Sequence, residues 1–111
     1  MRIAFFEATD KDVAYLKEKL SHHEVLFYTE TLNEETVAKA EGCEIVSVFI
    51  YSTVTASVLG KIPGLKGVLT RSTGFDHIDV ATCNEKGIVV ENVPFYGENT
   101  VAEHTFALIL A

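Results

Sequence analysis

Residues 44–50 read EIVSVFI and carry the strongest strand signal in this chain of 111 residues. The run is nearly continuous in apolar residues, most of them β-branched or aromatic, as in a strand that is buried on both faces of a sheet. Strands of that kind occur in parallel sheets whose two faces are covered by helices. This stretch therefore predicts an α/β fold with residues 44–50 near the middle of the sheet.

Four shorter strand-like runs lie on either side of this central stretch and alternate with helical patterns. They cover residues 2–6 (RIAFF), 23–28 (HEVLFY), 67–70 (GVLT) and 88–90 (IVV). Five strand–helix units in succession predict a doubly wound parallel sheet, and the flavodoxin-like strand order 2-1-3-4-5 is the natural choice. In such sheets ligands bind beyond the carboxyl ends of the strands, so the strand-end loops become the candidate site.

Capping residues predict where the helices begin. Thr9 or Asp10 is expected to begin the first, whose apolar positions Val13, Leu16 and Leu20 lie on one face. Asn33 is expected to cap a short second helix, which has a Leu32–Val37 staple and ends at Gly42. A third helix is expected to run from Thr53 through Leu59, and a fourth to begin at the cap Asp76, with Asp79 at N3, and to end at Gly87. The last helix is expected to begin at Asn99 or Thr100.

Composition limits the function classes. Nine basic against 16 acidic residues give a formal net charge of −7, which disfavours nucleic acid as a partner. No apolar run approaches the roughly 18 residues of a membrane span, and no signal peptide is visible, so we expect a single cytoplasmic domain. Cys43 and Cys83 lack metal-ligand spacing, so we expect two buried, reduced thiols and no metal site.

Known chemistries are mostly missing from the strand-end loops. The glycines do not form a GxGxxG motif, so the usual pyrophosphate-binding loop is absent. The loop at residues 7–10 (EATD) is acidic and would repel a phosphate. No Ser or Cys sits beside a plausible His base, so no catalytic residue is assigned. His77, in the first turn of the predicted fourth helix, and His104, in the last helix, are expected to be structural.

Residues 71–79 (RSTGFDHID) follow a strand and lead into a helix. The exposed N–H groups of Thr73 and Gly74 could hold a carboxylate there, aided by the helix dipole. A strand-to-helix turn that needs glycine for its shape alone is the alternative, and the residues leave both open. Residues 92–100 (NVPFYGENT) pose a similar choice, because the aromatic pair could line a pocket or pack against a helix.

The last helix is apolar on all sides over residues 106–111, which predicts burial all round. The chain stops there without a glycine cap, a basic last turn or a proline. We therefore expect these residues to be part of a longer protein.

The two loops and the last helix together resemble a known family. RSTGFDHID followed by NVPFYGENTVAEHTFALIL is similar to the N-terminal part of the NAD-dependent D-2-hydroxyacid dehydrogenases, closest to their D-lactate dehydrogenase branch. The resemblance covers the whole chain. It implies a flavodoxin-like substrate-binding (catalytic) domain over residues 1–98. Residues 99–111 would be the start of a helix at the interdomain cleft and dimer interface. In the family this helix leads into an NAD-binding Rossmann domain, which these 111 residues do not include.

The resemblance also implies roles for individual residues. Thr73 and Gly74 would offer N–H groups to the substrate carboxylate, Tyr51 and Tyr96 would line the same pocket, and Val101 would sit at the nicotinamide end of NAD. The family's substrate-binding Arg, its Glu, its catalytic His and its NAD loop would all lie beyond this segment.

Two functions are carried forward. The first is part of an oxidoreductase that interconverts a pyruvate-like 2-keto acid and a D-lactate-like 2-hydroxy acid with NAD(H), through a homodimer formed by the last helix, with the 111 residues alone inactive. The alternative is a stand-alone flavodoxin-like domain that binds an organic acid or self-assembles.

Overall fold

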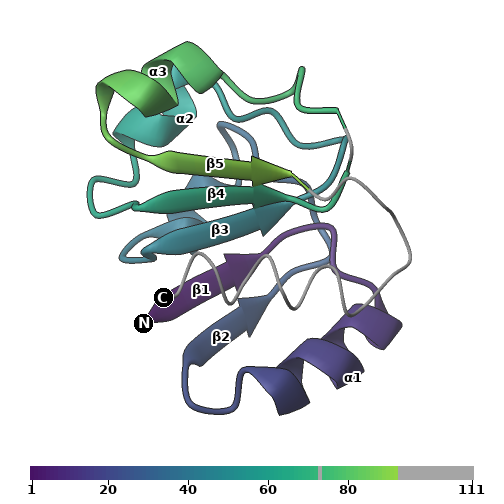
Figure 1. Cartoon of the computed structure of the whole chain (residues 1–111). Coiled ribbons are helices and arrows are strands. Elements are labelled where there is room, and N and C mark those ends of the chain that lie inside the picture. Colours follow the sequence, from purple (N-terminus) through teal and green to yellow (C-terminus); the bar gives the residue numbers. More distant parts are fainter. Residues whose placement is uncertain (73, 93–111) are drawn as a thin grey trace.

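A five-stranded, wholly parallel sheet forms the centre of the protein in the computed structural model, which describes residues 1–72 and 74–92. The strand order is β2-β1-β3-β4-β5, as predicted (Figure 1). The strands are β1 (Arg2–Phe5), β2 (Glu24–Phe27), β3 (Ile45–Val48), β4 (Gly67–Thr70) and β5 (Val89–Asn92). The predicted runs were each placed correctly, and β4 has the predicted bounds. The others differ by one to a few residues at their ends, because a strand stops where its neighbour no longer pairs with it.

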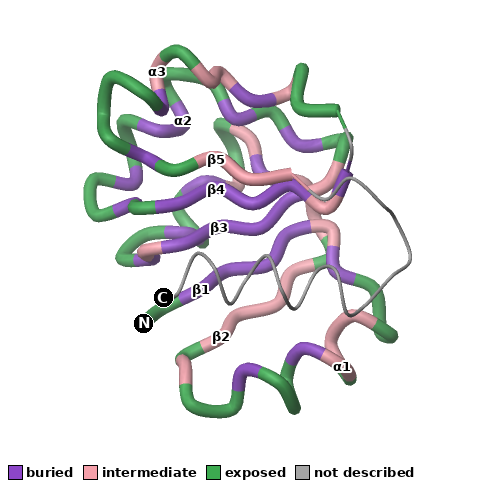
Figure 2. Tube along the Cα trace, viewed as in Figure 1, coloured by how far each residue is buried: buried purple, intermediate pink, exposed green. Residues whose placement is uncertain are grey.

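The central position of β3 explains its continuous apolar sequence. It pairs with β1 through Ile45 opposite Ile3 and with β4 through Val46 opposite Val68. All four of its residues are buried, whereas the edge strands β2 and β5 are only half-buried (Figure 2). The prediction of a strand covered on both faces is confirmed.

Successive side chains along each strand point to opposite faces of the sheet and pack into two separate cores, one on each face. Ile3, Phe5 and Leu69 pack with Leu16 and Leu20 of the α1 (Asp10–Lys19) segment on one face. The other face packs against α2 (Ala56–Gly60), α3 (Val80–Glu85) and the 3-10 helix η1 (Val37–Ala40). Figure 1 shows α1 on one side of the sheet and the α2–α3 pair on the other. Helices on both faces are thus confirmed.

The first helix begins as the sequence predicts. Thr9 is its N-cap and accepts a hydrogen bond from the N–H of Asp12, whose carboxylate accepts one from Thr9 in return. Gly42 and Gly87 follow η1 and α3 with left-handed φ values of 81° and 71°, where glycine is favoured.

Three of the predicted helix starts were wrong. Asn33 caps a turn, through bonds from Glu35 and Thr36, and only the 3-10 helix η1 follows it. The cap of α2 is Thr55 instead of Thr53, and the cap of α3 is Asp79 instead of Asp76. Both later starts have one cause, because Val54 pairs with Ile78 in an isolated parallel bridge that keeps both segments extended. The last helix, from Asn99 or Thr100, lies outside the described residues.

Candidate functional site

Three loops meet at the carboxyl ends of β1, β3 and β4. Because the strands are parallel neighbours, the segments that follow them emerge at the same edge of the sheet (Figure 1). The chain leaves β1 toward β2 on one side, and β3 lies on its other side, so this edge includes the topological switch point. These loops contain the residues that the sequence singled out.

Glu7 closes the loop after β1 and ties it to the loop after β3. Its carboxylate accepts hydrogen bonds from the N–H of Phe49 (2.8 Å), the N–H of Tyr51 (3.2 Å) and the hydroxyl of Ser52 (2.6 Å). The residue has a φ of 57°, a left-handed conformation that is uncommon outside glycine. The protein's own carboxylate therefore occupies N–H groups that a bound phosphate would need.

Arg71, directly after β4, points back into the protein. Its guanidinium donates to Ser47 Oγ (2.6 Å), to the carbonyl of Phe6 (2.7 Å) and to that of Glu7 (2.9 Å). Burial lowers the pKa of this guanidinium, an effect that the charges of Asp12 and Glu7 oppose. Through these bonds Arg71 links the end of β4 to Ser47 in β3 and to the segment that follows β1, and it is a structural cation.

The segment after Arg71 contains a chain of polar side chains. Thr70 Oγ1 lies 2.6 Å from Ser72 Oγ and 2.9 Å from His77 Nε2, and Ser72 Oγ donates to the carbonyl oxygen of Gly74 (2.7 Å). Thr70 and Ser72 are fully buried. His77 lies before α3, outside its first turn where the sequence placed it. Burial lowers the pKa of His77, against the charges of Glu7 and Asp76.

Gly74 is exposed at the tip of this segment. Its φ is outside the left-handed region, and a Cβ added to it would meet no atom within 4 Å. Neither backbone conformation nor crowding by the described residues therefore demands a glycine at this position.

The loops after β3 and β4 are held to each other by the bridge at Val54. Its N–H donates to the carbonyl of His77 (2.8 Å), and its carbonyl accepts from the N–H of Asp79 (2.9 Å). Tyr51, three residues before Val54, is 74% exposed, and Phe75 beside Gly74 is 47% exposed. Two aromatic side chains thus stand free on linked loops, next to the exposed glycine.

The structure does not describe every predicted site residue. Tyr51 and Gly74 lie on the linked loops, whereas Thr73, Tyr96 and Val101 lie outside the described residues. Sequence reasoning missed Glu7, Arg71 and the Thr70–Ser72–His77 chain. The one signal available for Arg71 was a lone basic residue at the end of a buried strand in an acidic protein.

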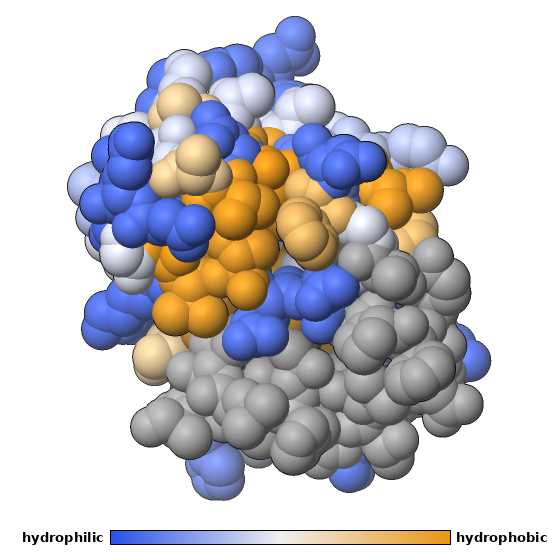
Figure 3. Space-filling view, turned by 45° about the horizontal axis from the view of Figure 1, so that its top comes forward, coloured by the Kyte–Doolittle hydropathy of each residue, from blue (hydrophilic) through white to orange (hydrophobic). Residues whose placement is uncertain are grey.

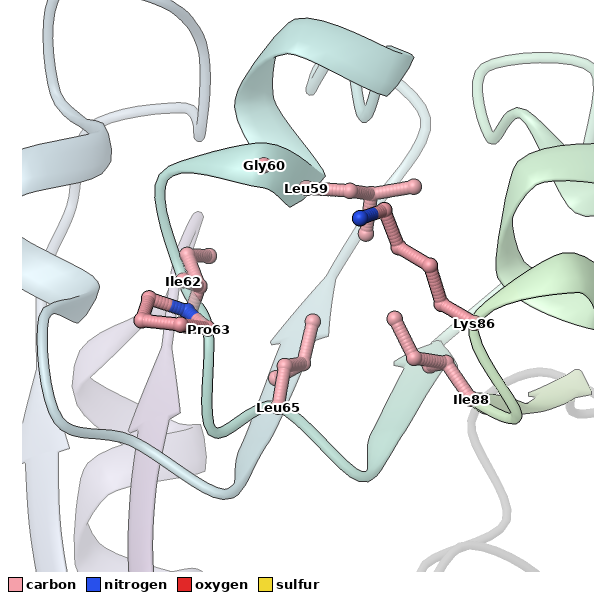
Figure 4. Close-up of a pocket in the computed structure, with 7 residues that line it drawn as sticks. All are labelled: Leu59, Gly60, Ile62, Pro63, Leu65, Lys86 and Ile88. Atoms are coloured by element: carbon pink, nitrogen blue, oxygen red, sulfur yellow. The ribbon is translucent and has the colours of Figure 1, made fainter.

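A hydrophobic hollow lies at the opposite end of the sheet, before β4 and β5. Its volume is about 280 Å³, and Figure 4 shows Leu59, Ile62, Leu65 and Ile88 around it with the amine of Lys86 reaching across. Figure 3 turns the α2–α3 side forward and shows hydrophobic side chains gathered among hydrophilic ones. Apart from Lys86 this hollow offers no polar side chain that could orient a ligand.

Other sites can be judged only within the described residues. There, no group of three His, Cys, Asp or Glu side chains could hold a metal ion, and no helix is long and apolar enough to cross a membrane. Cys43 and Cys83 are buried free thiols, as predicted, and burial raises the pKa of both.

Comparisons with known proteins agree on one family. The model of the D-isomer specific 2-hydroxyacid dehydrogenase catalytic domain matches residues 3–107. The chain is 35% identical to a 2-hydroxyacid dehydrogenase homolog of Haemophilus influenzae over 99% of its own length and 34% of that protein's. It is 30% identical to D-lactate dehydrogenase of Escherichia coli, again over 99% of this chain and 35% of the relative.

Solved structures show the same relationship. A D-lactate dehydrogenase of Aquifex aeolicus, solved in complex with NAD and lactic acid, superimposes with a TM-score of 0.78 at 40% identity. The match covers 97% of this chain and 32% of that one. The chain therefore spans about a third of the length of the relatives that it matches. Over nearly all of its residues, the chain belongs to the D-isomer specific 2-hydroxyacid dehydrogenase family, in the part that forms the catalytic domain.

Proposed function

We propose that these residues are the substrate-binding part of an NAD-dependent dehydrogenase that interconverts a small 2-keto acid such as pyruvate and the D-2-hydroxy acid such as D-lactate. Membership of the family and similarity to proteins named D-lactate dehydrogenase support the reaction class. The lactic acid and NAD in the structure of the Aquifex aeolicus relative support the substrate and the cofactor.

The observation that carries the proposal is the unexplained glycine at position 74. It is exposed at the carboxyl edge of the sheet, without a left-handed φ and without a crowding neighbour among the described residues. A glycine in such a place allows a ligand to approach the backbone closely, because no side chain shields the N–H group. A substrate carboxylate could then accept hydrogen bonds from the N–H groups of Gly74 and Thr73, which are strong because the acceptor is charged.

The remaining roles in the proposal follow from the family resemblance. Tyr51 is exposed on the loop that Val54 links to the Gly74 segment, so it is available to line the same pocket. Tyr96 would be a second lining residue and Val101 would lie near the nicotinamide. We further propose residues 1–98 as the substrate-binding domain, residues 99–111 as the start of a helix that forms a homodimer interface, and a cytoplasmic enzyme.

The described residues do not fit the pyrophosphate of NAD. They contain no GxGxxG run, and at the end of β1 the carboxylate of Glu7 already takes the N–H groups of Phe49 and Tyr51. NAD would therefore bind elsewhere in the full-length enzyme. The Arg, Glu and His that complete the family's chemistry would also lie outside these residues. The part played by this chain is to bind and orient the keto acid.

Two substitutions at one position test the carboxylate contact in the full-length enzyme. Gly74→Pro removes the N–H group, whereas Gly74→Ala keeps it and adds a methyl group to open space. Losing one hydrogen bond to a charged acceptor should lower kcat/KM for pyruvate by about 10- to 100-fold in the proline variant. The alanine variant keeps the N–H group but places a methyl group beside it where the substrate approaches, so its kcat/KM should fall less than that of the proline variant.

The comparison is read at equal folded fraction, checked by thermal unfolding of both variants. Equal kcat/KM in Gly74→Pro and Gly74→Ala would contradict the proposed contact, because only the proline variant lacks the N–H group. Absence of any keto-acid reduction by the wild-type enzyme would reject the reaction class itself.

A further inference from the structure

The polar chain Thr70–Ser72–His77 sits directly beneath the turn that contains Gly74. Thr70 is the last residue of β4, where a purely structural strand in a parallel sheet would carry a β-branched apolar residue. Instead, the fully buried hydroxyls of Thr70 and Ser72 lie in contact, and the His77 ring completes the chain. Buried polar groups cost free energy unless they are paired, so their presence here requires an explanation.

The direction of each hydrogen bond follows from counting protons. The carbonyl of Gly74 can only accept, so the single hydroxyl proton of Ser72 is donated to it. At the 2.6 Å contact between the two hydroxyls, Thr70 must therefore be the donor. Since the proton of Thr70 is then used, His77 Nε2 must donate to Thr70 Oγ1. The chain runs in one direction from the His77 ring to the carbonyl of Gly74.

The last bond of the chain holds the backbone of the turn. It joins the Ser72 side chain to the carbonyl of Gly74, the residue whose N–H group the proposed carboxylate contact needs. The orientation of the Gly74 backbone is thus linked to Ser72. Because successive hydrogen bonds polarise one another, the donor at the start of the chain strengthens the bond at its end.

We propose that His77 is a positioning residue: its Nε2–H, acting through the hydroxyls of Thr70 and Ser72, orients the N–H group of Gly74 for the substrate carboxylate. This role rests on the proposed function, because it presupposes that the turn binds a carboxylate. His77 touches neither the turn nor, in this account, the substrate. Its effect is transmitted by the two hydroxyls.

Two further observations support this role. The backbone of His77 is fixed independently, since its carbonyl accepts from the N–H of Val54 in the bridge between the loops. Burial lowers the pKa of the ring, with Glu7 and Asp76 as the facing charges that oppose it, and this favours a neutral ring. A neutral ring that donates through Nε2 has an unprotonated Nδ1, which is a definite and measurable tautomer.

The tautomer is the first readout and needs no variant. We would label the histidines of the 111-residue chain with ¹⁵N and assign the ring nitrogens of His77 at a pH where the ring is neutral. A protonated Nε2 with an unprotonated Nδ1 is expected. The reverse tautomer would overturn the proposal, because Nε2 could then only accept and the chain would lack its first donor.

Paired variants provide the second readout. The conservative variants are His77→Gln, which places an amide donor at a similar reach, and Thr70→Ser, which keeps the hydroxyl. The disrupting variants His77→Met and Thr70→Val remove the donor and the hydroxyl. His22→Met, at an exposed histidine outside the site, is the control. The probe is the ¹⁵N–¹H resonance of Gly74 in the full-length enzyme during a pyruvate titration. Both disrupting variants should move this resonance without ligand and weaken pyruvate binding roughly 3- to 10-fold. The conservative variants and the control should match the wild type.

The outcomes separate this inference from the proposed function. If the wild type responds to pyruvate and His77→Met and Thr70→Val respond equally well, the positioning role is wrong and the proposed function stands. If Gly74 in the wild type does not respond to pyruvate although the expected tautomer is found, the proposed contact is wrong and the ligand role of His77 is overturned with it. If a variant fails to fold, the wild-type tautomer still decides the direction of the chain.

Discussion

Arg71→Met gives the sharpest test of how the carboxyl edge of the sheet is held together. The guanidinium supplies three hydrogen bonds, to the hydroxyl of Ser47 and to the carbonyls of Phe6 and Glu7, at 2.6, 2.7 and 2.9 Å. Methionine fills most of the same volume but donates nothing, so three acceptors, two of them on the fully buried residues Ser47 and Phe6, lose this partner. At about 1.5 kcal/mol for each bond from a charged donor, the upper limit is about 4.5 kcal/mol. Since water can reach part of the site, we expect a loss of about 3 kcal/mol in the free energy of unfolding.

Urea unfolding followed by circular dichroism measures this loss. With a slope of about 1.5 kcal/mol per molar urea for a domain of this size, the midpoint should fall by about 2 M. Arg2→Met is the matched control, because the Arg2–Glu24 ion pair has side chains that are 43% and 63% exposed. That variant should lose less than about 1 kcal/mol. An Arg71→Met protein within about 1 kcal/mol of the wild type would refute the assignment of Arg71 as the structural cation of this edge.

Three further predictions concern other parts of the chain. Gly42→Ala should lower the free energy of unfolding by about 1 kcal/mol, because the φ of Gly42 is 81°. Gly64→Ala is the control and should not lower it, because Gly64 lies in open space and has no such φ. Chemical denaturation of both variants measures the two free energies of unfolding. The Asp79 carboxylate accepts from the N–H of Thr82, which lowers its pKa, so its contribution is present above its ordinary pKa of about 4 and disappears as the pH falls through the lowered value. Asp79→Ala should therefore be less stable than the wild type at pH 7, and the difference should shrink as the pH falls from 7 toward 2; an unchanged difference would contradict the capping role. The purified 111-residue chain should not oxidise NADH with pyruvate, as followed by absorbance, and clear turnover would show that the catalytic groups lie within it.

The sequence predicted the sheet well because its signals there are local or repeated. The apolar run at residues 44–50 identified the central strand, and five alternating units with tight connections left few possible strand orders. The start of the first helix could be narrowed to Thr9 or Asp10 because a capping side chain acts on residues only a few positions further along, and the structure shows Thr9 as the cap. The residues of β4 could be bounded at both ends, by Gly67 at the start and the polar segment after Thr70.

The errors arose where distant parts of the chain decide the local structure. Nothing near Thr53 or Asp76 indicates that Val54 and Ile78 pair, and that bridge delays both helices. The partners of Glu7 lie 42 to 45 residues away, so its role could not be seen in its own neighbourhood. His77 looked like a residue of the first helical turn, and only the fold brings its ring to Thr70.

The most direct test of the central claim is a crystal structure of the full-length enzyme with oxamate, the unreactive amide analogue of pyruvate. We predict a carboxylate oxygen about 2.7–3.2 Å from the backbone nitrogen of Gly74, with the Ser72 hydroxyl still bonded to the Gly74 carbonyl. Oxamate bound away from this turn, with the N–H group of Gly74 facing only water, would contradict it.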